Sequence, residues 1–364
     1  MTTTYRYIFA DLLSNNTIAE LPLTNVSFTQ QLNQAGTFSG SILLTGIDSE
    51  KYNAINGTIP GRTTLFVDRD GTIIWGGIIW GRSYNSNEQT LSFNAREFES
   101  YFERRRITTT TSFTNQDQLA IARNLITQAQ SAAYGDIGIL VGTETSGINL
   151  SRTYYGYEHK QTYQAIQDIA RQEDGFDFLI ECAYDGGGTI IKTLKLGYPR
   201  IGTAYTSSSI TVPVFELPAS NIVFYDFSED ASNMANTVYA LGAGSNEGKL
   251  IITEQDTAKF AEGWALLEEQ SNYSDVTSSA YLEELAEGQV LAISEPIGIF
   301  KIIVPAFEQP LFGSYSIGDD ARLRITDQRF PTTLDEIYRI VGITVTPGED
   351  GPERVTLTLT TTTN

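Results

Sequence analysis

Histidine and cysteine are nearly missing from this chain of 364 residues, which contains one of each, His159 and Cys182. One thiol makes no disulfide within a chain, and zinc sites of histidine and cysteine need several such ligands. Catalysis by a histidine base is also excluded unless His159 itself acts as the base. These absences leave the chain few residues with which to do chemistry.

Long apolar runs are missing as well. The densest run, Ile73–Trp80, has eight residues, whereas a helix that spans a bilayer needs about 20. Residues 1–11 contain no apolar stretch of the length found in secretory signals. We therefore expect a protein that is synthesised in the cytoplasm and does not insert directly into a membrane.

Basic residues are few, with 24 Lys and Arg against 44 Asp and Glu, so the formal net charge is −20. A surface of this sign repels nucleic-acid phosphates and anionic lipids, which disfavours a general nucleic-acid-binding protein. Hydrophobic residues make up 41% of the chain and charged residues 19%. This composition is typical of a soluble globular protein, and the length suffices for two or three domains.

The pattern of short β-strands is abundant. Thr, Ile, Val, Tyr and Phe occur in short runs that Gly, Asn, Asp and Pro interrupt. Asp70 and Gly71 separate two such runs and favour a type I′ turn, which predicts a hairpin. The glycine-rich segment 185–188 predicts a second hairpin between two further runs.

Helical periodicity, with apolar residues three or four positions apart, occurs in four segments between the β-regions. These segments are Asn115–Ala132, Gln161–Glu173, Thr257–Gln270 and Thr277–Val290. Asn115 is a candidate N-cap of the first helix, and Gly135 and Gly175 are expected to end the first and second. The predicted fold class is therefore mainly β with helical insertions, an α+β fold.

An internal repeat is the most informative feature of the sequence. Each copy has a glycine turn, an alternating strand, a strand with internal glycine, a polar loop and a further strand. The matching segments are 61–69 with 318–327, 73–79 with 338–345, and 89–93 with 353–359. Because the matches keep one order and similar spacing, they predict two similar β-barrel modules per chain.

Each module is expected to be interrupted by an inserted segment. The predicted boundaries are 1–107 for the first β-barrel module, 108–200 for an α/β insertion domain, 234–255 and 291–364 for the second β-barrel module, and 256–290 for a helical insertion. A return strand near Asn221–Phe227, within 201–233, is expected to complete the first barrel.

Three motifs that could bind a metal or take part in catalysis have simpler structural interpretations. Asp68–Gly71 contains a fragment of a calcium loop, but it lacks the downstream glutamate of an EF-hand and fits a plain turn better. His159 stands beside Glu158, a pair able to move protons, but no nucleophile in a recognisable motif accompanies it, so a loop histidine is preferred. Cys182 is flanked by strand residues and is expected to be a small buried hydrophobe.

Two clusters leave alternatives open. Arg104–Arg106 either contacts an acidic neighbouring subunit or DNA, or neutralises the nearby Glu97, Glu99 and Glu103, which is the preferred interpretation. The aromatic cluster Tyr154–Tyr157 either stacks on a sugar or ties a loop onto a sheet, which is the commoner arrangement.

Adjacent acids also suggest chemistry, because glycoside hydrolysis needs only two carboxyl groups. The pairs considered are Glu268–Glu269, Glu283–Glu284 and Asp319–Asp320. With 44 acids in the chain such pairs are expected by chance, and the two glutamate pairs fit solvated helix faces. No catalytic, cofactor-binding or metal-binding residue is therefore nominated, and no cofactor is expected.

Several strand and helix signatures follow one another in a fixed order: Leu12, Pro22, Val26–Phe28, Gly36–Leu44, the 65–79 hairpin, Asn236–Gly244, Ala280–Val290 and Ile317–Asp320. In order and spacing they resemble the baseplate-hub and tail-tip proteins of tailed bacteriophages, which are related to the hubs of contractile injection systems. The resemblance covers nearly the whole chain, although no single motif in it is specific.

The resemblance implies a structural virion protein at the distal end of a tail, made in the host cytoplasm, and not an enzyme. In that family three chains form a ring, a homotrimer, whose six β-barrels match a hexameric tail tube. The implied partners are the tail tube or distal tail protein above, tip or fibre proteins below, and the tape-measure protein. Double-stranded DNA would pass through the ring without sequence-specific binding.

The acidity of the chain suits such a channel. Three chains carry a formal charge of −60, and an acidic wall repels phosphate where lysine or arginine would hold it. Solubility alone also accounts for an acidic surface, so the placement of the acids decides between the two explanations.

Two other functions remain as alternatives. A tail-associated enzyme that degrades cell wall or polysaccharide would need two carboxyl groups in a cleft, and a carbohydrate-binding receptor protein would use Tyr154–Tyr157. The sequence, which closes with residues 356–364, stops right after the last strand of the second module, so we expect no additional catalytic domain.

Overall fold

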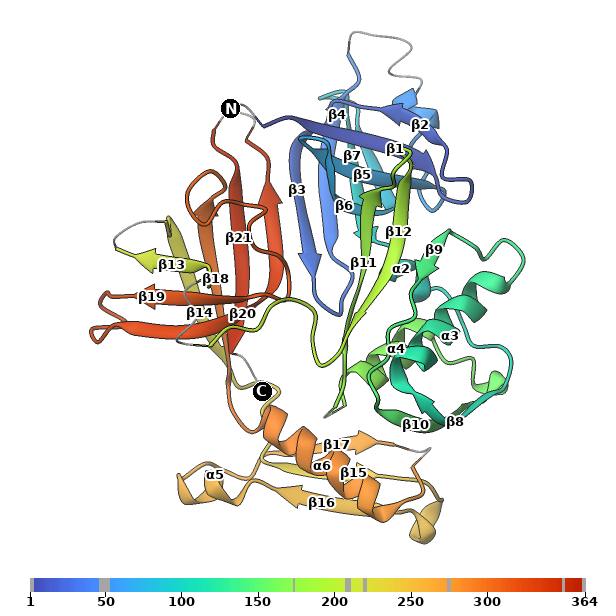
Figure 1. Cartoon of the computed structure of the whole chain (residues 1–364), viewed down its shortest axis with the longest axis vertical. Coiled ribbons are helices and arrows are strands. Elements are labelled where there is room, and N and C mark those ends of the chain that lie inside the picture. Colours follow the sequence, from blue (N-terminus) through green and yellow to red (C-terminus); the bar gives the residue numbers. More distant parts are fainter. Residues whose placement is uncertain are drawn as a thin grey trace.

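One β-sheet of 13 strands contains much of the chain in the computed structural model (Figure 1). The N-terminal quarter of the chain builds one part of this sheet, and the C-terminal residues build the other. The structure describes residues 3–45, 53–172, 174–206, 211–218, 221–273, 276–348 and 351–361.

The first part of the sheet comes from residues 5–97. Its strands are β1 (Tyr5–Asp11), β2 (Thr17–Glu20), β3 (Thr24–Gln31), β4 (Thr37–Leu43), β5 (Thr63–Arg69), β6 (Thr72–Asn85) and β7 (Thr90–Glu97). They lie in the order β2-β1-β5-β6-β7-β4-β3, and neighbouring strands are antiparallel. The predicted β5–β6 hairpin is confirmed, because Arg69 lies opposite Thr72 and both turn residues, Asp70 and Gly71, have positive φ.

The second part of the sheet comes from residues 214–361. Its strands are β13 (Val214–Leu217), β14 (Phe224–Asp230), β18 (Ile297–Pro305), β19 (Asp320–Ile325), β20 (Leu334–Thr346) and β21 (Arg354–Thr361). They lie in the order β14-β18-β21-β20-β19-β13, and only β13 runs parallel to its neighbour.

The two parts repeat one strand order and one register. The series β5, β6, β7, β4, β3 corresponds to β19, β20, β21, β18, β14. Phe38 of β4 lies opposite Ala95 of β7, and at the equivalent place Phe300 of β18 lies opposite Leu359 of β21. The internal repeat seen in the sequence is thus a repeat of strand pairing.

The two long strands, β6 and β20, carry the same irregularity. The β6–β7 register shifts between Ile79 and Gly81, and the β20–β21 register shifts between Ile340 and Gly342. The glycine equivalent to Gly342 is therefore Gly81, and the sequence match that aligned it with residues 76–77 is displaced along the strand.

Alternating apolar residues explain how the sheet folds. In β7, positions 91, 93 and 95 are buried and their neighbours are less so, which is the period of two expected of a half-buried strand. The core that these residues enter runs through both parts of the sheet and includes Phe9, Trp75 and Phe300. Large side chains of this kind each contribute about 2–3 kcal/mol through burial.

Residues 99–197 form an insertion that packs on the first part of the sheet; in Figure 1 its strands β11 and β12 lie alongside that part and its helices α3 and α4 lie below. Its elements are α2 (Glu99–Phe102), β8 (Thr111–Asp117), α3 (Gln118–Ser131), β9 (Ile139–Val141), β10 (Asn149–Tyr154), η1 (Gly156–Glu158), α4 (Thr162–Ala170), β11 (Asp177–Tyr184) and β12 (Ile190–Gly197). The predicted second hairpin is confirmed as β11–β12. Gly76 lets β11 approach β6, because a Cβ there would lie 2.6 Å from the Cys182 sulfur.

Two predicted helices are present here as α3 and α4, with different ends. Asp117, not Asn115, is the N-cap of α3, since its carboxylate accepts hydrogen bonds from the N–H groups of Leu119 and Ala120. Both helices end four or five residues before the glycines expected to end them. Glu173, the last residue of the second predicted helix, lies outside the described residues.

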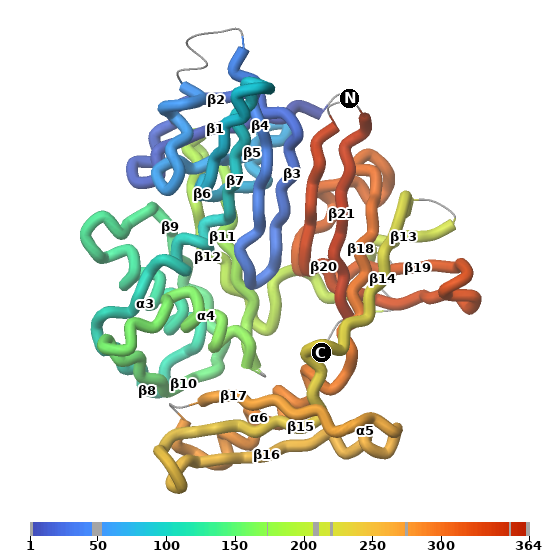
Figure 2. The backbone as a smooth tube through the Cα atoms, turned by 180° about the vertical axis from the view of Figure 1, so that it is seen from behind, coloured from blue at the N-terminus to red at the C-terminus, as the bar shows by residue number. Residues whose placement is uncertain are grey.

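Residues 237–293 form a small unit with its own sheet. Its elements are β15 (Thr237–Leu241), η2 (Asn246–Gly248), β16 (Ile251–Gln255), α5 (Thr257–Ala261), β17 (Glu268–Asn272) and α6 (Ser279–Ile293). The strand order is β16-β15-β17, and α6 packs on this sheet, as Figure 2 shows from behind. The predicted helix at Thr277–Val290 is confirmed as α6.

Three predictions for this region are wrong. The segment 234–255 contributes β15 and β16 to the small sheet, not to the second part of the large sheet. The predicted helix Thr257–Gln270 stops after Ala261, because Gly263 takes a φ of +96° and the chain then pairs as β17 beside β15. The return strand near Asn221–Phe227 is β14, which pairs with β18 and so does not complete the first part.

The small unit leaves the large sheet through a hairpin that can be closed without it. Asp230 of β14 lies opposite Ile297 of β18, and Asn-Gly closes such a pair as a type I′ turn. We expect a variant with Asn-Gly in place of residues 231–296 to keep the large sheet, seen as β-type circular dichroism and a cooperative thermal transition. An aggregated or non-cooperative product would show that the sheet depends on the small unit.

Candidate functional site

The two parts of the large sheet meet where β3 pairs with the second half of β20. The strands are antiparallel, and Gln31 lies opposite Gly342. Thr29 and Thr344 face each other further along, with their hydroxyl groups 2.7 Å apart in a hydrogen bond. Both views show β3 and β20 side by side, so this junction holds the two parts together (Figures 1 and 2).

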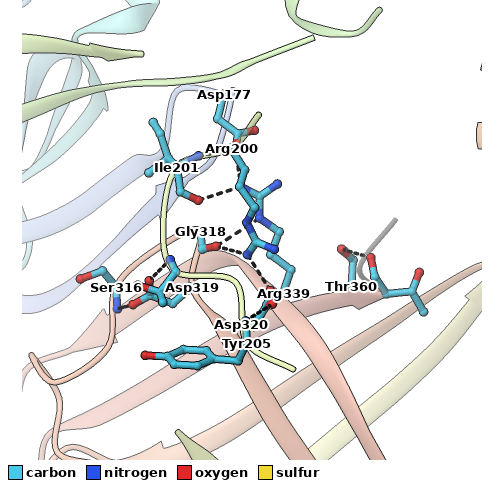
Figure 3. A network of polar contacts seen from close by, with 12 residues as sticks. Asp177, Arg200, Ile201, Tyr205, Ser316, Gly318, Asp319, Asp320, Arg339 and Thr360 are labelled. Atoms are coloured by element: carbon cyan, nitrogen blue, oxygen red, sulfur yellow. Dashed lines mark hydrogen bonds and ion pairs between the residues drawn. The ribbon is translucent and has the colours of Figure 1, made fainter. Parts of the chain in front are cut away.

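A network of charged side chains closes one end of the junction (Figure 3). Arg339 of β20 pairs with the carboxylate of Asp177, the first residue of β11, and donates to the carbonyl of Ile201 at 2.9 Å. The Asp177 carboxylate also accepts from the Ile201 N–H at 2.8 Å and from the Asn33 amide at 2.9 Å. Because Asn33 follows β3, Asp177 connects both parts of the sheet to the insertion.

Arg200 and the adjacent acids Asp319 and Asp320 complete this junction network. Arg200 Nη2 lies 2.6 Å from Asp320 Oδ1, and the other Asp320 oxygen accepts from the Tyr205 N–H at 2.9 Å. Asp319 accepts from the Thr203 N–H at 2.6 Å. The segment that leaves the insertion is therefore bound along the start of β19.

Two glycines allow this close approach. Gly202 and Gly318 both have positive φ, +87° and +91°, a conformation that favours glycine. A Cβ on Gly202 would lie 2.2 Å from the carbonyl carbon of Gly318. A larger residue at either position would push the segment away from β19.

The junction network contributes to the stability of the fold because its aspartates are buried. Asp177 and Asp320 are 5% and 2% exposed, and a buried carboxylate costs several kcal/mol unless a counter-charge and hydrogen bonds compensate. Each has an arginine partner and a backbone N–H donor. The junction network therefore fixes the two parts of the sheet and the insertion relative to one another.

A second group of side chains closes the other end of the junction. Glu353, in the loop between β20 and β21, accepts two hydrogen bonds from Arg69 of β5, at 2.8 and 2.7 Å, and one from the Tyr5 hydroxyl. The Arg69 guanidinium also stacks over Phe312. Burial, followed by the Glu353 contact, raises the pKa of Tyr5 above its usual range, so the phenol stays a donor.

No family model matches this chain by sequence, and no curated protein matches it. Solved structures match along almost its full length. A tail protein from Neisseria meningitidis is 16% identical, with a TM-score of 0.62 over 98% of this chain and 96% of the other. A prophage tail protein from Shewanella oneidensis is 13% identical, with a TM-score of 0.62 and 98% of both chains covered. This chain has the fold of phage tail proteins.

Two further structures extend the likeness. A prophage tail protein from Listeria monocytogenes is 12% identical, with a TM-score of 0.55 over 97% of this chain and 94% of the other. A chain of the lidded Francisella PdpA–VgrG complex is 9% identical, with a TM-score of 0.56 over 99% of this chain but 53% of that one. The tail-protein fold thus includes both parts of the sheet and both insertions, and it also occurs within longer chains.

The three candidate acid pairs lie in different environments in the structure. Asp319 and Asp320 are brought into the junction network, where all four carboxylate oxygens accept hydrogen bonds. Glu268–Glu269 lies on β17, not on the helix that the sequence predicts. Glu283–Glu284 is exposed on α6, in agreement with a solvated helix face.

The turn interpretation of Asp68–Gly71 is confirmed. One Asp68 oxygen accepts from the Gly71 N–H at 2.7 Å, and the other accepts from the Tyr184 hydroxyl at 2.7 Å and from Arg6 at 3.2 Å. This aspartate therefore binds the hairpin tip and the insertion. In the described ranges of the chain, no three His, Cys, Asp or Glu side chains gather as metal ligands would.

The preferred interpretation of Arg104–Arg106 is wrong in detail. Glu103 is held by Arg96, whose two terminal nitrogens lie 2.7 and 2.6 Å from its carboxylate oxygens. Arg104 stacks over Trp80 of the sheet, Arg105 donates to a carbonyl of α3, and Arg106 donates to the carbonyls of Glu103 and Arg105. Arg104 therefore packs the insertion onto the sheet, whereas Arg105 and Arg106 bond within the insertion.

The aromatic cluster divides between core and surface. Tyr154 is buried against Phe113, whereas Tyr155 and Tyr157 stack on each other with ring centroids 5.3 Å apart and are 44% and 75% exposed. His159 follows in an exposed turn with a φ of +49°.

Cys182 is buried, as expected, and burial raises the pKa of its thiol. No helix among the described residues has the length and apolarity needed to cross a membrane.

Two carboxyl groups near the start of α2, Glu97 and Glu99, are buried, which was not expected from the sequence. Glu97 accepts from the Gly36 N–H at 2.7 Å, and Glu99 accepts from the Ile180 N–H of β11 at 2.5 Å. Burial raises the pKa of both groups, to about 7 for Glu99. The inward alternation of β7 at positions 91, 93 and 95 already pointed to burial of Glu97.

The raised pKa of Glu99 gives a pH dependence. The group binds its proton more tightly when folded, so its stabilising contribution is present below about pH 4.5 and is lost as the pH rises through about 7. We expect Glu99→Gln to raise the free energy of unfolding above pH 7, by up to about 3 kcal/mol. Urea unfolding between pH 5 and 9 tests this, with the exposed Glu88→Gln as the control. A parallel shift of both variants at all pH values would contradict it.

The junction network gives a second expectation. Asp177→Ala leaves the mostly buried Arg339 without its carboxylate partner, so we expect the free energy of unfolding to fall by about 3–5 kcal/mol. The control is Glu181→Ala on the same strand, since the Glu181–Lys195 pair is about half exposed and should contribute less than about 1 kcal/mol. Urea denaturation measures both, and equal losses would show that the network does not hold the junction.

Proposed function

We propose that this chain is a structural component of a phage-type tail, a hub or tail-tip protein that joins the tail tube to the distal tip as a homotrimer. The observation that carries the proposal is the repeated strand register of the two parts of the sheet. Three copies of a chain with two equivalent modules present six modules, which matches a hexameric tube. The tail-protein fold supports a place in the tail.

The chemistry of the chain supports a structural role and not an enzymatic one. The acid pair best placed for catalysis, Asp319–Asp320, has its oxygens committed to hydrogen bonds. The buried carboxyl groups Glu97 and Glu99 are held by backbone N–H groups. These groups join segments of the chain, which is the work of a scaffold.

The implied partners and cargo belong to the same proposal. The ring would contact the tail tube or distal tail protein on one side, tip or fibre proteins on the other, and the tape-measure protein. Double-stranded DNA would pass through it, and the formal charge of −20 per chain would keep phosphate from binding to the wall.

A second candidate function has one observation in its favour. Tyr155 and Tyr157 form an exposed stacked pair, and such rings bind sugar faces in carbohydrate-binding proteins. Binding of host-wall polysaccharide to the purified chain, lost in Tyr157→Ala, would establish a receptor function.

The oligomeric state tests the proposed function. We expect the purified chain to have three times its chain mass by light scattering, and its copy number in assembled tails to be a multiple of three. A copy number that three does not divide would remove the model.

A further inference from the structure

A strand edge that is covered in one module is open in the other. In β20, residues 342–345 are covered by β3. The equivalent residues of β6, Gly81–Tyr84, pair only with β7, and among the described residues their backbone makes no further hydrogen bond to another segment. Unpaired edges of this kind are templates for another strand.

The equivalence of the two edges rests on hydrogen bonds as well as register. Just before the open stretch, the Ile79 carbonyl accepts from the Gly61 N–H at 2.7 Å. At the equivalent place in the second module, the Ile340 carbonyl accepts from the Gly318 N–H at 2.8 Å. Immediately after this bond, the second module pairs with β3, whereas among the described residues the first module pairs with no further strand and only the Arg82 side chain bonds to residues 55 and 58.

The strand that would fill the open edge is present at the far end of the sheet. β14 is the equivalent of β3, since Phe227 lies opposite Phe300 as Phe28 lies opposite Phe38. β14 is the terminal strand, bonded only to β18. The outer side of β14 therefore corresponds to the side of β3 that pairs with β20.

We propose that β14 of one chain pairs with residues 81–85 of β6 in a second copy of this chain, in the register of the β3–β20 junction. This places Asp230 opposite Gly81, Glu229 opposite Arg82, Ser228 opposite Ser83, and Phe227 opposite Tyr84. The inference rests on the proposed function, because it names the surfaces through which the trimer closes.

The opposed residues suit one another. Glu229 and Arg82 carry opposite charges, and opposed charges stabilise a cross-strand pair. Within one chain Arg82 donates to the Ile55 and Thr58 carbonyls and Glu229 pairs with the exposed Arg329, so the contact between chains would add to or replace these bonds. Ser228 and Ser83 repeat the hydroxyl pair that Thr29 and Thr344 form within the chain.

Apolar exposure points the same way. Tyr84 is 55% exposed, and the proposed register places its ring beside the Phe227 ring, on the same face of the paired strands.

The geometry of the contact also limits the assembly. It joins two different edges, so it is a head-to-tail contact, which either closes into a ring or continues as a filament. The same pairing already joins the two modules within the chain. A ring of three chains would then repeat one junction at all six module boundaries and leave neither edge open.

Cross-linking tests the proposed register. In the Ser83→Cys, Ser228→Cys variant, two directly opposed residues of neighbouring chains come within disulfide distance. We expect oxidation to give covalent dimers and trimers on a denaturing gel, with trimer as the end point. Cys182 does not interfere because it is buried.

Two matched variants control the experiment. Thr29→Cys with Thr344→Cys places the same pair at the internal junction, so oxidation should give a disulfide within one chain and no larger species. Ser83→Cys with Asp226→Cys is displaced by two residues on the same strand face and should cross-link at least tenfold more slowly.

The outcomes separate the pairing from the oligomeric state. A trimer by light scattering that cross-links no faster at residue 228 than at residue 226 overturns the pairing and leaves the proposed function standing. A chain that stays monomeric overturns both. As a second variant, Glu229→Lys should weaken the trimer at least tenfold, and Arg82→Glu in the same chain should restore it. Absence of restoration would contradict the Glu229–Arg82 contact.

Discussion

The pairing of β3 with β20 is the contact on which the rest of the structure depends. β20 is longer than β19, so its edge beyond Arg339 needs another strand to satisfy its backbone N–H and C=O groups. β3 supplies that strand from about 310 residues earlier in the chain. Because the two strands join, the apolar faces of both parts form one continuous core.

The insertions are arranged around this junction. The first begins after β7 and returns to it, and its returning segment supplies Asp177 and Arg200 to the junction network. The second leaves the β14–β18 hairpin and has a small core of its own, which includes Val276 and Leu282. One insertion therefore stabilises the junction, whereas the other is attached to the outer strands.

Local features of the fold could be predicted from the sequence, and partners of strands could not. Asp70 and Gly71 act on their own backbone, so the hairpin they form was predictable. The segment after Ala261 has helical spacing, but backbone N–H groups at residues 236 and 237 bond to Leu267 and direct it into a sheet. The same limit explains why β14 was predicted as a strand but assigned to the wrong part of the sheet.

The candidate sites also divide into features that the local sequence predicts and features that depend on partners distant in sequence. Asp319 and Asp320 attracted attention as an acid pair, yet Asp320 pairs with Arg200 and Asp319 accepts from the Thr203 N–H, and both partners are far away in sequence. Glu97 continues the inward alternation of β7 and could have been found, whereas burial of Glu99 depends on contact with β11 and has no local signal. The resemblance to tail proteins rested on the order of the strands and helices. This order is kept even where individual residues differ.

The side-chain groups at the two ends of the β3–β20 junction have a mechanical consequence. Hydrogen bonds between antiparallel strands are perpendicular to the strands, so a force along the strands loads them all at once. A force across the strands instead loads the terminal bond first, and the ladder would open by peeling. The Asp177–Arg339 pair lies at one end of the ladder, and Glu353 with Arg69 lies at the other. Peeling from either end must therefore break a mostly buried ion pair before it reaches the ladder, which gives the junction resistance to tension in both directions.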